Sequence, residues 1–192
     1  MIANRKIYDN LQIKYDFSDM EIAKLNYTLE VLFFELSKLL FFVLFFGITH
    51  KLVDFIVCFI VLLPFRSFSG GLHFNHYISC FMFSIAYFST IIFFLSGIPV
   101  TPALYAPILI IVNILLFVIG PVPSKKRPVM PVRQYRIFRA IASFFAGIYS
   151  ILILIVDDMP FQNLIVWALV LHTLQIICAR LVRKGDKIHE KA

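Results

Sequence analysis

Residues 77–97 read YISCFMFSIAYFSTIIFFLSG and contain no Asp, Glu, Lys or Arg. A helix that crosses a bilayer needs about 20 predominantly apolar residues, so this run has the length and composition of a transmembrane span. Further apolar runs occupy residues 31–49, 52–65, 103–120, 139–156 and 161–179, of which 52–65 is short and 139–156 is marginal. The sequence therefore predicts an all-α fold, a polytopic integral membrane helical bundle of about six transmembrane helices.

The composition supports this prediction. Of 192 residues 60% are hydrophobic and 22 are phenylalanine, and the mean hydropathy is +0.88. A soluble domain could not cover so much apolar surface with so few polar residues. We expect a cytoplasmic amphipathic N-terminal segment over 1–28, one transmembrane domain over 29–180 and a basic cytoplasmic tail over 181–192. No short apolar core followed by a small-residue cleavage site precedes the first run, so we expect no removable secretory signal.

Residues 1–28 are too polar to cross a membrane. Apolar residues recur among lysines at roughly helical intervals, which predicts short amphipathic helices on the membrane surface: Ile7, Leu11, Ile22 and Leu25. Ser18 and Glu21 have the spacing of a capping box, so the second of these helices should begin near Asp19.

Basic residues gather in alternate connections. They lie in the N-terminal segment, in the connection after residue 120 and in the C-terminal tail, whereas the intervening connections carry little positive charge. By the positive-inside rule both termini should be cytoplasmic, and the 66–76 connection should lie on the same side. In so apolar a chain the net charge of +7 indicates contact with anionic lipid headgroups rather than nucleic acid.

Several polar residues inside the runs have ordinary structural explanations. Glu35 and Lys38 are three residues apart and can form an ion pair on one helix face, and Asp54 should be interfacial. His172 and Gln175 can hydrogen-bond across helices. Cys58 and Cys178 are expected to be small buried residues, and three widely spaced cysteines argue against a disulfide framework.

The stretch from Pro64 to Cys80, PFRSFSGGLHFNHYISC, is different in character. It places a cation, hydroxyls, two adjacent glycines, two histidines and a thiol between two apolar runs. Such groups are costly at a membrane, which makes a functional site the leading interpretation.

Cys80 could act as a nucleophile if a base lay beside it. On a continuous helix His76, four residues earlier, would be the neighbour, because seven residues place His73 about 10.5 Å away along the axis. Gly70 and Gly71 make a helical path through this region doubtful, and a turn there could bring His73 back over the next helix. Spacing alone therefore leaves both histidines open.

The same stretch supplies the other groups that acyl chemistry needs. Gly70 and Gly71 allow backbone N–H groups to approach an oxyanion, Ser67 and Ser69 carry hydroxyl donors, and Arg66 could hold a carboxylate or orient the loop. A third catalytic group is not defined, because Ser69, Asn75 and Ser79 could each orient an imidazole.

Arg66, the run Ser69-Gly70-Gly71-Leu72-His73 and Cys80 seven residues further on resemble the signature of the accessory gene regulator protein B (AgrB) family. The Gly120–Pro128 connection, GPVPSKKRP, and the overall size are also similar to that family. The family comprises bacterial membrane cysteine endopeptidases of quorum sensing. The resemblance implies that Cys80 is the nucleophile and His73 the general base, supported by Arg66 and Gly71, without a metal or cofactor.

The resemblance also implies the substrate, an AgrD-like propeptide with an amphipathic leader and an acidic C-terminal tail. Cleavage through an acyl-enzyme thioester and capture by an internal Cys or Ser would give a thiolactone or lactone, at the cytoplasmic side of the bacterial cell membrane. The Lys125, Lys126 and Arg127 cluster could bind the acidic tail, residues 1–28 could dock the leader, and a homodimer is expected. Two other hypotheses are a non-enzymatic peptide transporter, and a metal or haem site at His73, His76 and Cys80.

Overall fold

The structure is a computed structural model that describes residues 18–72, 76–122, 131–156 and 160–189. The chain forms two compact units, Met1–His50 and Lys51–Ala192. The site residues predicted at His73, Asn75, Lys125, Lys126 and Arg127 lie outside the described residues, as do the helices expected before Asp19.

The first unit contains helix α2, Asp19–Ile48. The predicted capping box is confirmed, because the Ser18 backbone N–H donates to Glu21 Oε2 at 2.9 Å and the Glu21 N–H donates to Ser18 Oγ at 3.4 Å. The helix continues without a break to Ile48. The surface helix expected near Asp19 and the apolar run 31–49 are thus one helix. The residues where the two meet, such as Glu30 and Leu32, are good helix formers, so no residue there ends the helix.

The second unit is helical throughout its described residues. Its elements are α3 (Leu52–Phe68), α4 (Tyr77–Ser89), the π-helical turn η1 (Thr90–Phe94), the 3₁₀ turn η2 (Leu95–Gly97), α5 (Pro102–Ile119), α6 (Val132–Ile155) and α7 (Gln162–His189). Helix α4 and the two turns form one continuous segment over residues 77–97, as the sequence predicts. The all-α prediction is confirmed for the described part of the chain.

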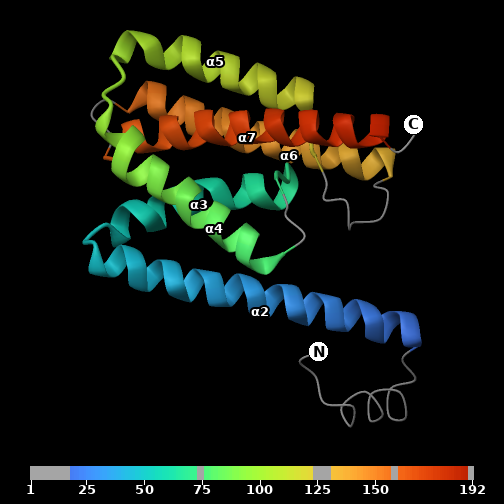
Figure 1. Ribbon diagram of the computed structural model, residues 1–192. Coiled ribbons are helices and arrows are strands. Elements are labelled where there is room, and N and C mark those ends of the chain that lie inside the picture. Colours follow the sequence, from blue (N-terminus) through green and yellow to red (C-terminus); the bar gives the residue numbers. More distant parts are fainter. Residues whose placement is uncertain (1–17, 73–75, 123–130, 157–159, 190–192) are drawn as a thin grey trace. The chain divides into compact units, whose positions relative to one another are not determined.

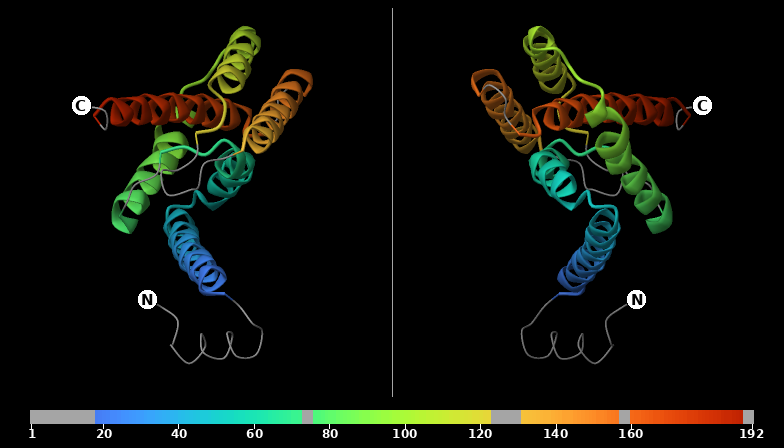
Figure 2. Two further views of the ribbon diagram at one scale, coloured as in Figure 1. Left: turned by 90° about the vertical axis from the view of Figure 1, so that its right-hand side faces the viewer. Right: turned by 90° about the vertical axis from the view of Figure 1, so that its left-hand side faces the viewer.

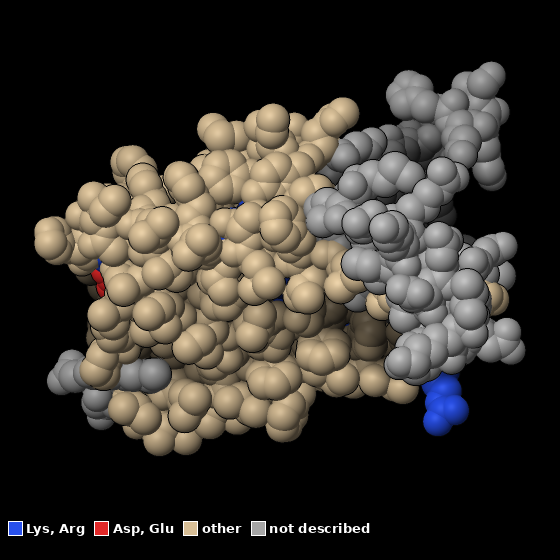
Figure 3. Space-filling model, turned by 90° about the horizontal axis from the view of Figure 1, so that it is seen from below, with Lys and Arg blue, Asp and Glu red and all other residues tan. Residues whose placement is uncertain are grey.

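Four helical segments of the described residues are long and apolar enough to cross a membrane: Tyr77–Gly97, Pro102–Ile119, Val132–Ile155 and Gln162–Val182. Helix α3 has 17 residues, which corresponds to about 26 Å at 1.5 Å per residue. In the view of Figure 3 the described surface is nearly all uncharged, with few Lys, Arg, Asp or Glu side chains. The chain is therefore a membrane protein, and the total of about six spans stays a prediction.

Two helices extend beyond their expected limits. Helix α6 begins at Val132 instead of residue 139, because Pro131 caps it and accepts the Tyr135 N–H at 3.0 Å, and arginine is a good helix former. Arg133, Arg136 and Arg139 thus lie on the helix instead of in the preceding connection. Helix α7 continues to His189, so the expected tail over 181–192 begins as helix.

The core of the second unit lies where α3, α5, α6 and α7 meet. Helices α6 and α7 each pack against both α3 and α5, and α5, α6 and α7 lie together on one side of α3 (Figure 1, Figure 2). Phe65, Leu109, Ala146, Val166 and Leu169 are buried at this junction. Small residues such as Ala146 let helices approach closely, which is how helices associate in a membrane.

The connections meet at two separate ends of this bundle. At one end Ser69 and Gly70 lie beside Val122. At the other, Asn163 of α7 donates to the carbonyls of Ser96 and Ile98, at 2.6 and 2.8 Å. The start of the 66–76 connection and the start of the connection at Gly120 therefore lie at the same end, as the alternation of charge predicts.

Candidate active site

Helix α3 ends where the glycines of the reactive stretch begin. The Ser69 N–H donates to the Phe65 carbonyl at 2.8 Å and closes the last turn. Gly70 has φ +75° and Gly71 has φ +151°, backbone conformations that other residues rarely adopt. Residues 66–68 are still helical, but the chain leaves the helical path at Gly70 and Gly71, where the sequence made such a path doubtful.

A second connection pairs with this turn. Gly70 and Val122 form an isolated parallel β-bridge, and the Val122 N–H donates to the Ser69 carbonyl at 2.8 Å. Gly120, with φ +66°, turns the chain after α5 so that Val122 can reach Ser69. The structure thus joins the two motifs that carry the family resemblance.

Helix α7 supports the turn from a third direction. Ser69 Oγ lies 2.9 Å from Nε2 of His172, and the Ser69 hydroxyl also donates to the Phe65 carbonyl at 2.5 Å. Gln175 follows His172 by about one turn of α7, and its Nε2 lies 3.0 Å from the position that a Cβ on Gly71 would occupy. The expected cross-helix hydrogen bond of His172 is confirmed, but the sequence did not show that its partner is in the reactive stretch.

Ser69 and His172 have the spacing of a hydroxyl nucleophile and its base, but not the environment. Their exposed fractions are 3% and 1%. The hydroxyl hydrogen is directed to Phe65, so it is not held by the imidazole, as a base would require. This pair is structural, and Ser69 supports the turn rather than attacking a substrate.

Cys80 is the fourth residue of α4, and its side chain is half-buried. Its N–H donates to the carbonyl of His76 at 3.1 Å. His76 is the N-cap, with the extended backbone angles φ −104° and ψ 138°, and it is exposed. The argument that favoured His76 required both residues to be helical, so it no longer selects His76 as the base.

Arginines surround the same end of the bundle. Arg66 lies in the last turn of α3, with Cζ 6.0 Å from the ring centroid of Phe88. Arg180 donates to the Ile119 carbonyl at the end of α5, and Arg139 Cζ is 4.7 Å from the ring centroid of Phe117. Cations at a helix C-terminus stabilise its unpaired carbonyls. Arg180 therefore stabilises the end of α5 from which the connection to Val122 starts, and Arg139 packs on the last turns of the same helix.

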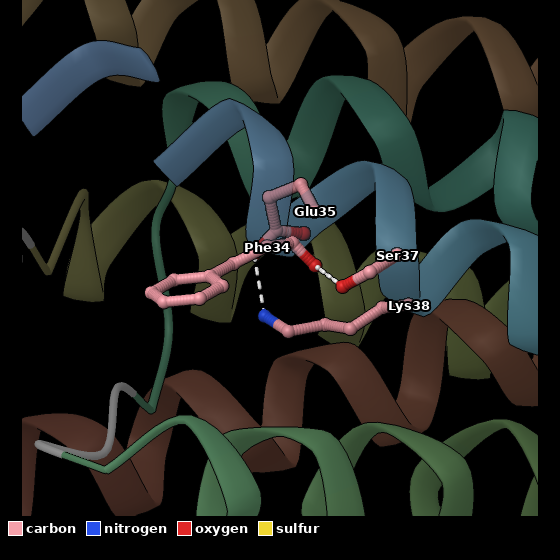
Figure 4. Close-up of polar contacts among 4 residues, drawn as sticks. All are labelled: Phe34, Glu35, Ser37 and Lys38. Carbon is pink, nitrogen blue, oxygen red and sulfur yellow. Dashed lines mark hydrogen bonds and ion pairs between the residues drawn. The ribbon is translucent and has the colours of Figure 1, made fainter. Parts of the chain in front are cut away.

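The other polar residues singled out from the sequence have local partners. Within α2, Lys38 Nζ lies 2.7 Å from Glu35 Oε1, and the Ser37 hydroxyl donates to the Phe34 carbonyl at 2.9 Å (Figure 4). Lys51 Nζ lies 3.1 Å from Asp54 Oδ2. The predicted Glu35–Lys38 pair is confirmed.

Cys58 and Cys178 differ in how deeply they are buried. All three are thiols rather than disulfides. Cys58 is buried as expected, but the expectation for Cys178 is wrong, because it is exposed on α7 beside the buried Ala179. Successive residues of a helix point about 100° apart, so the face that buries Ala179 directs Cys178 outward. Among the described residues no three His, Cys, Asp or Glu side chains are grouped to hold a metal ion.

The geometry can be compared with known proteins. The family model described as "Accessory gene regulator B" matches residues 3–177. This chain belongs to the AgrB family. An AgrB-like protein of Clostridium beijerinckii is 29% identical over 161 residues, which cover 83% of this chain and 79% of that protein. No solved structure matches the chain.

Membership in the AgrB family supports involvement in the agr quorum-sensing system and implies an AgrD-type propeptide as partner. The residues that sequence reasoning left without a role are His172 and Gln175. The available signal was their position, two polar side chains three residues apart in an apolar run.

Proposed function

We propose that this protein is a membrane cysteine endopeptidase that removes the C-terminal tail of an AgrD-type propeptide and promotes cyclisation of the remaining peptide. The observation that carries the proposal is the packing of the Ser69–Gly71 turn against α7 and Val122, directly before the helix that carries Cys80. A built turn of this kind, next to a half-buried thiol in an AgrB family member, supports acyl chemistry at this end of the bundle.

In the first step the Cys80 thiolate attacks the carbonyl carbon of the last residue of the signal segment. His73 has taken the proton of the Cys80 thiol and gives it to the amine of the leaving tail as the C–N bond breaks, and a thioester joins the peptide to Cys80. Replacing an amide by a thioester is unfavourable, so departure of the tail must draw the step forward. Limited access of water at the membrane protects the thioester from hydrolysis.

In the second step a thiol or hydroxyl of the bound peptide attacks the thioester. The Cys80–carbonyl bond breaks, the proton of the attacking thiol or hydroxyl passes through His73 to Cys80, and the product is a cyclic thiolactone or lactone. With a thiol as acceptor one thioester replaces another, so this step is nearly balanced. Gly70 and Gly71 fit the role of letting backbone N–H groups approach the oxyanion of either step.

The test is mass spectrometry of an AgrD-type precursor co-expressed in membranes with the wild type or with single variants. Cys80→Ala and His73→Ala should abolish removal of the tail, whereas His76→Ala should retain it. Cys58→Ala and Cys178→Ala are matched thiol controls and should cleave. Cleavage that survives Cys80→Ala would exclude a cysteine peptidase. If the Cys80→Ser variant still transports the peptide and no cleavage is observed, the result would favour a peptide transporter.

The proposal includes a binding role for Lys125, Lys126 and Arg127. These residues follow Val122, which pairs with the turn, so the cluster is connected to the site by a short segment of chain. Cations there would attract the acidic tail of the precursor. Reversal of the three charges should raise the KM for cleavage more than it lowers kcat. Unchanged cleavage at unchanged expression would remove this role.

A further inference from the structure

The direction of the hydrogen bonds at Ser69 defines the state of His172. A hydroxyl has one hydrogen to donate, and Ser69 directs it to the Phe65 carbonyl at 2.5 Å. The 2.9 Å contact with His172 must therefore have Nε2–H as its donor. His172 thus carries a hydrogen on Nε2, and its other ring nitrogen, Nδ1, takes no part in this contact.

The second ring nitrogen, Nδ1, has a different environment. Nδ1 of His172 is buried and has no hydrogen-bond partner in the described part of the chain. An unpaired polar atom in the interior destabilises the folded state, and an apolar side chain at position 172 would avoid the loss. Among the described residues, the ring nitrogen of His172 that makes a hydrogen bond is therefore Nε2.

Helix α7 reaches the turn with two side chains on one face. His172 and Gln175 are three residues apart, which places them on the same side of a helix. His172 contacts Ser69 at the start of the turn, and Gln175 lies against Gly71 at its end. The ring of His172 is itself held against Phe65, with ring centroids 5.3 Å apart. One helix, α7, thus lies against the turn at both ends, with a hydrogen bond at Ser69 and close approach at Gly71.

We propose that His172, with Gln175, is a positioning residue: from α7 its Nε2–H holds the Ser69–Gly71 turn in the conformation that the reaction at Cys80 requires. This inference rests on the proposed function for the reaction that it serves. It assigns the last described helix a part in supporting the site.

The test uses two variants that differ in which nitrogen they imitate. The amide nitrogen of Gln lies near the place of Nε2, and that of Asn near the place of Nδ1. The full chain in liposomes is treated with N-ethylmaleimide, and alkylation of Cys80 is followed by mass spectrometry of its peptide. We expect His172→Gln to stay close to the wild-type rate. His172→Asn and His172→Ala should be slower by about tenfold or more, because small misplacements near a reacting group are costly.

Two further variants keep the test decisive. Thr173→Val is the matched control, since Thr173 is equally buried but donates only to Leu169 of its own helix, at 2.8 Å. Ser69→Ala removes the acceptor with a minimal change of shape and should slow alkylation as His172→Asn does, which carries the test if His172→Asn does not fold. Equal rates for His172→Gln and His172→Asn, or a wild-type rate for Ser69→Ala, would overturn the inference.

The same experiment separates this inference from the proposed function. His73→Ala reports on the assigned base, so an unchanged Cys80 rate in that variant would count against the Cys80–His73 pair. The difference between His172→Gln and His172→Asn does not depend on that result. A slow His73→Ala variant with equal rates for the two His172 variants would overturn the positioning role alone.

Discussion

Ser69 Oγ lies 2.9 Å from Nε2 of His172, although the two residues are 103 positions apart in the sequence. This contact joins the turn after α3 to α7, the last helix of the bundle. The reactive stretch is therefore held by a neighbouring helix as well as by its own loop. Substitutions at Gly71 and Gly120, which border the turn, test whether its backbone conformation is required.

Gly71→Ala is expected to reduce both stability and cleavage of an AgrD-type precursor. A Cβ at this position lies 3.0 Å from Gln175 Nε2, and φ is +151°. Gln175 can move its amide aside, but the backbone conformation cannot change without moving the turn. We expect a loss of about 1–3 kcal/mol in the free energy of unfolding, measured by thermal denaturation in detergent.

Gly147→Ala is the control for this prediction, because a Cβ on Gly147 meets nothing within 4 Å. It replaces a helical glycine and should be neutral or slightly stabilising. Adding Gln175→Ala to Gly71→Ala should restore little, since the backbone strain persists. Equal stability and activity of the two alanine variants would contradict the described turn.

Gly120→Ala should disturb the pairing of Val122 with Ser69. The new Cβ would lie 2.3 Å from the hydroxyl oxygen of Tyr135, and φ is +66°. Tyr135→Phe removes that oxygen but leaves the backbone strain of about 1–2 kcal/mol. The double variant should therefore recover part of the lost thermal stability and cleavage. A double variant no better than Gly120→Ala would mean that the clash with Tyr135 is not the cause.

Asn163→Ala should destabilise the protein without a comparable loss of cleavage. Its amide donates to the Ser96 and Ile98 carbonyls at 2.6 and 2.8 Å and accepts the Val100 N–H at 3.2 Å. Loss of these partners at the end of the bundle away from the turn should cost about 2 kcal/mol in the free energy of unfolding.

Trp167→Phe removes a single hydrogen bond to the Ile98 carbonyl, at 3.0 Å, and should cost less than Asn163→Ala in the same denaturation experiment. Precursor cleavage below the denaturation midpoint should be similar in both variants. A specific loss of cleavage in Asn163→Ala would show that the two ends of the bundle are coupled.

A double-mutant cycle can measure the polar contact between α5 and α6. Asn113 Nδ2 of α5 donates to Ser150 Oγ of α6 at 2.8 Å. Cross-helix hydrogen bonds in membranes average about 0.6 kcal/mol, so Asn113→Leu and Ser150→Ala should show a coupling of that size. Strictly additive losses in thermal denaturation would indicate that the contact contributes nothing to stability.

Short-range signals made several elements predictable. The capping box at Ser18 and Glu21 and the turn at Gly70 and Gly71 depend on neighbouring residues only, and both are present. The run 77–97 has the expected bounds, because span length follows from bilayer thickness. The predicted start of α6 was wrong. The arginines of its first two turns were assigned to a connection because of their charge, although arginine is a good helix former.

The sequence by itself determined an apolar helical membrane protein, the place of the turn and the residues that resemble the AgrB signature, because composition, hydrophobic runs and local backbone preferences act over short distances. Only the tertiary structure decided that His172 donates to Ser69, that Gln175 borders Gly71 and that Val122 pairs with Gly70. Those contacts depend on which faces of distant helices pack together, and many apolar faces in one chain are chemically alike.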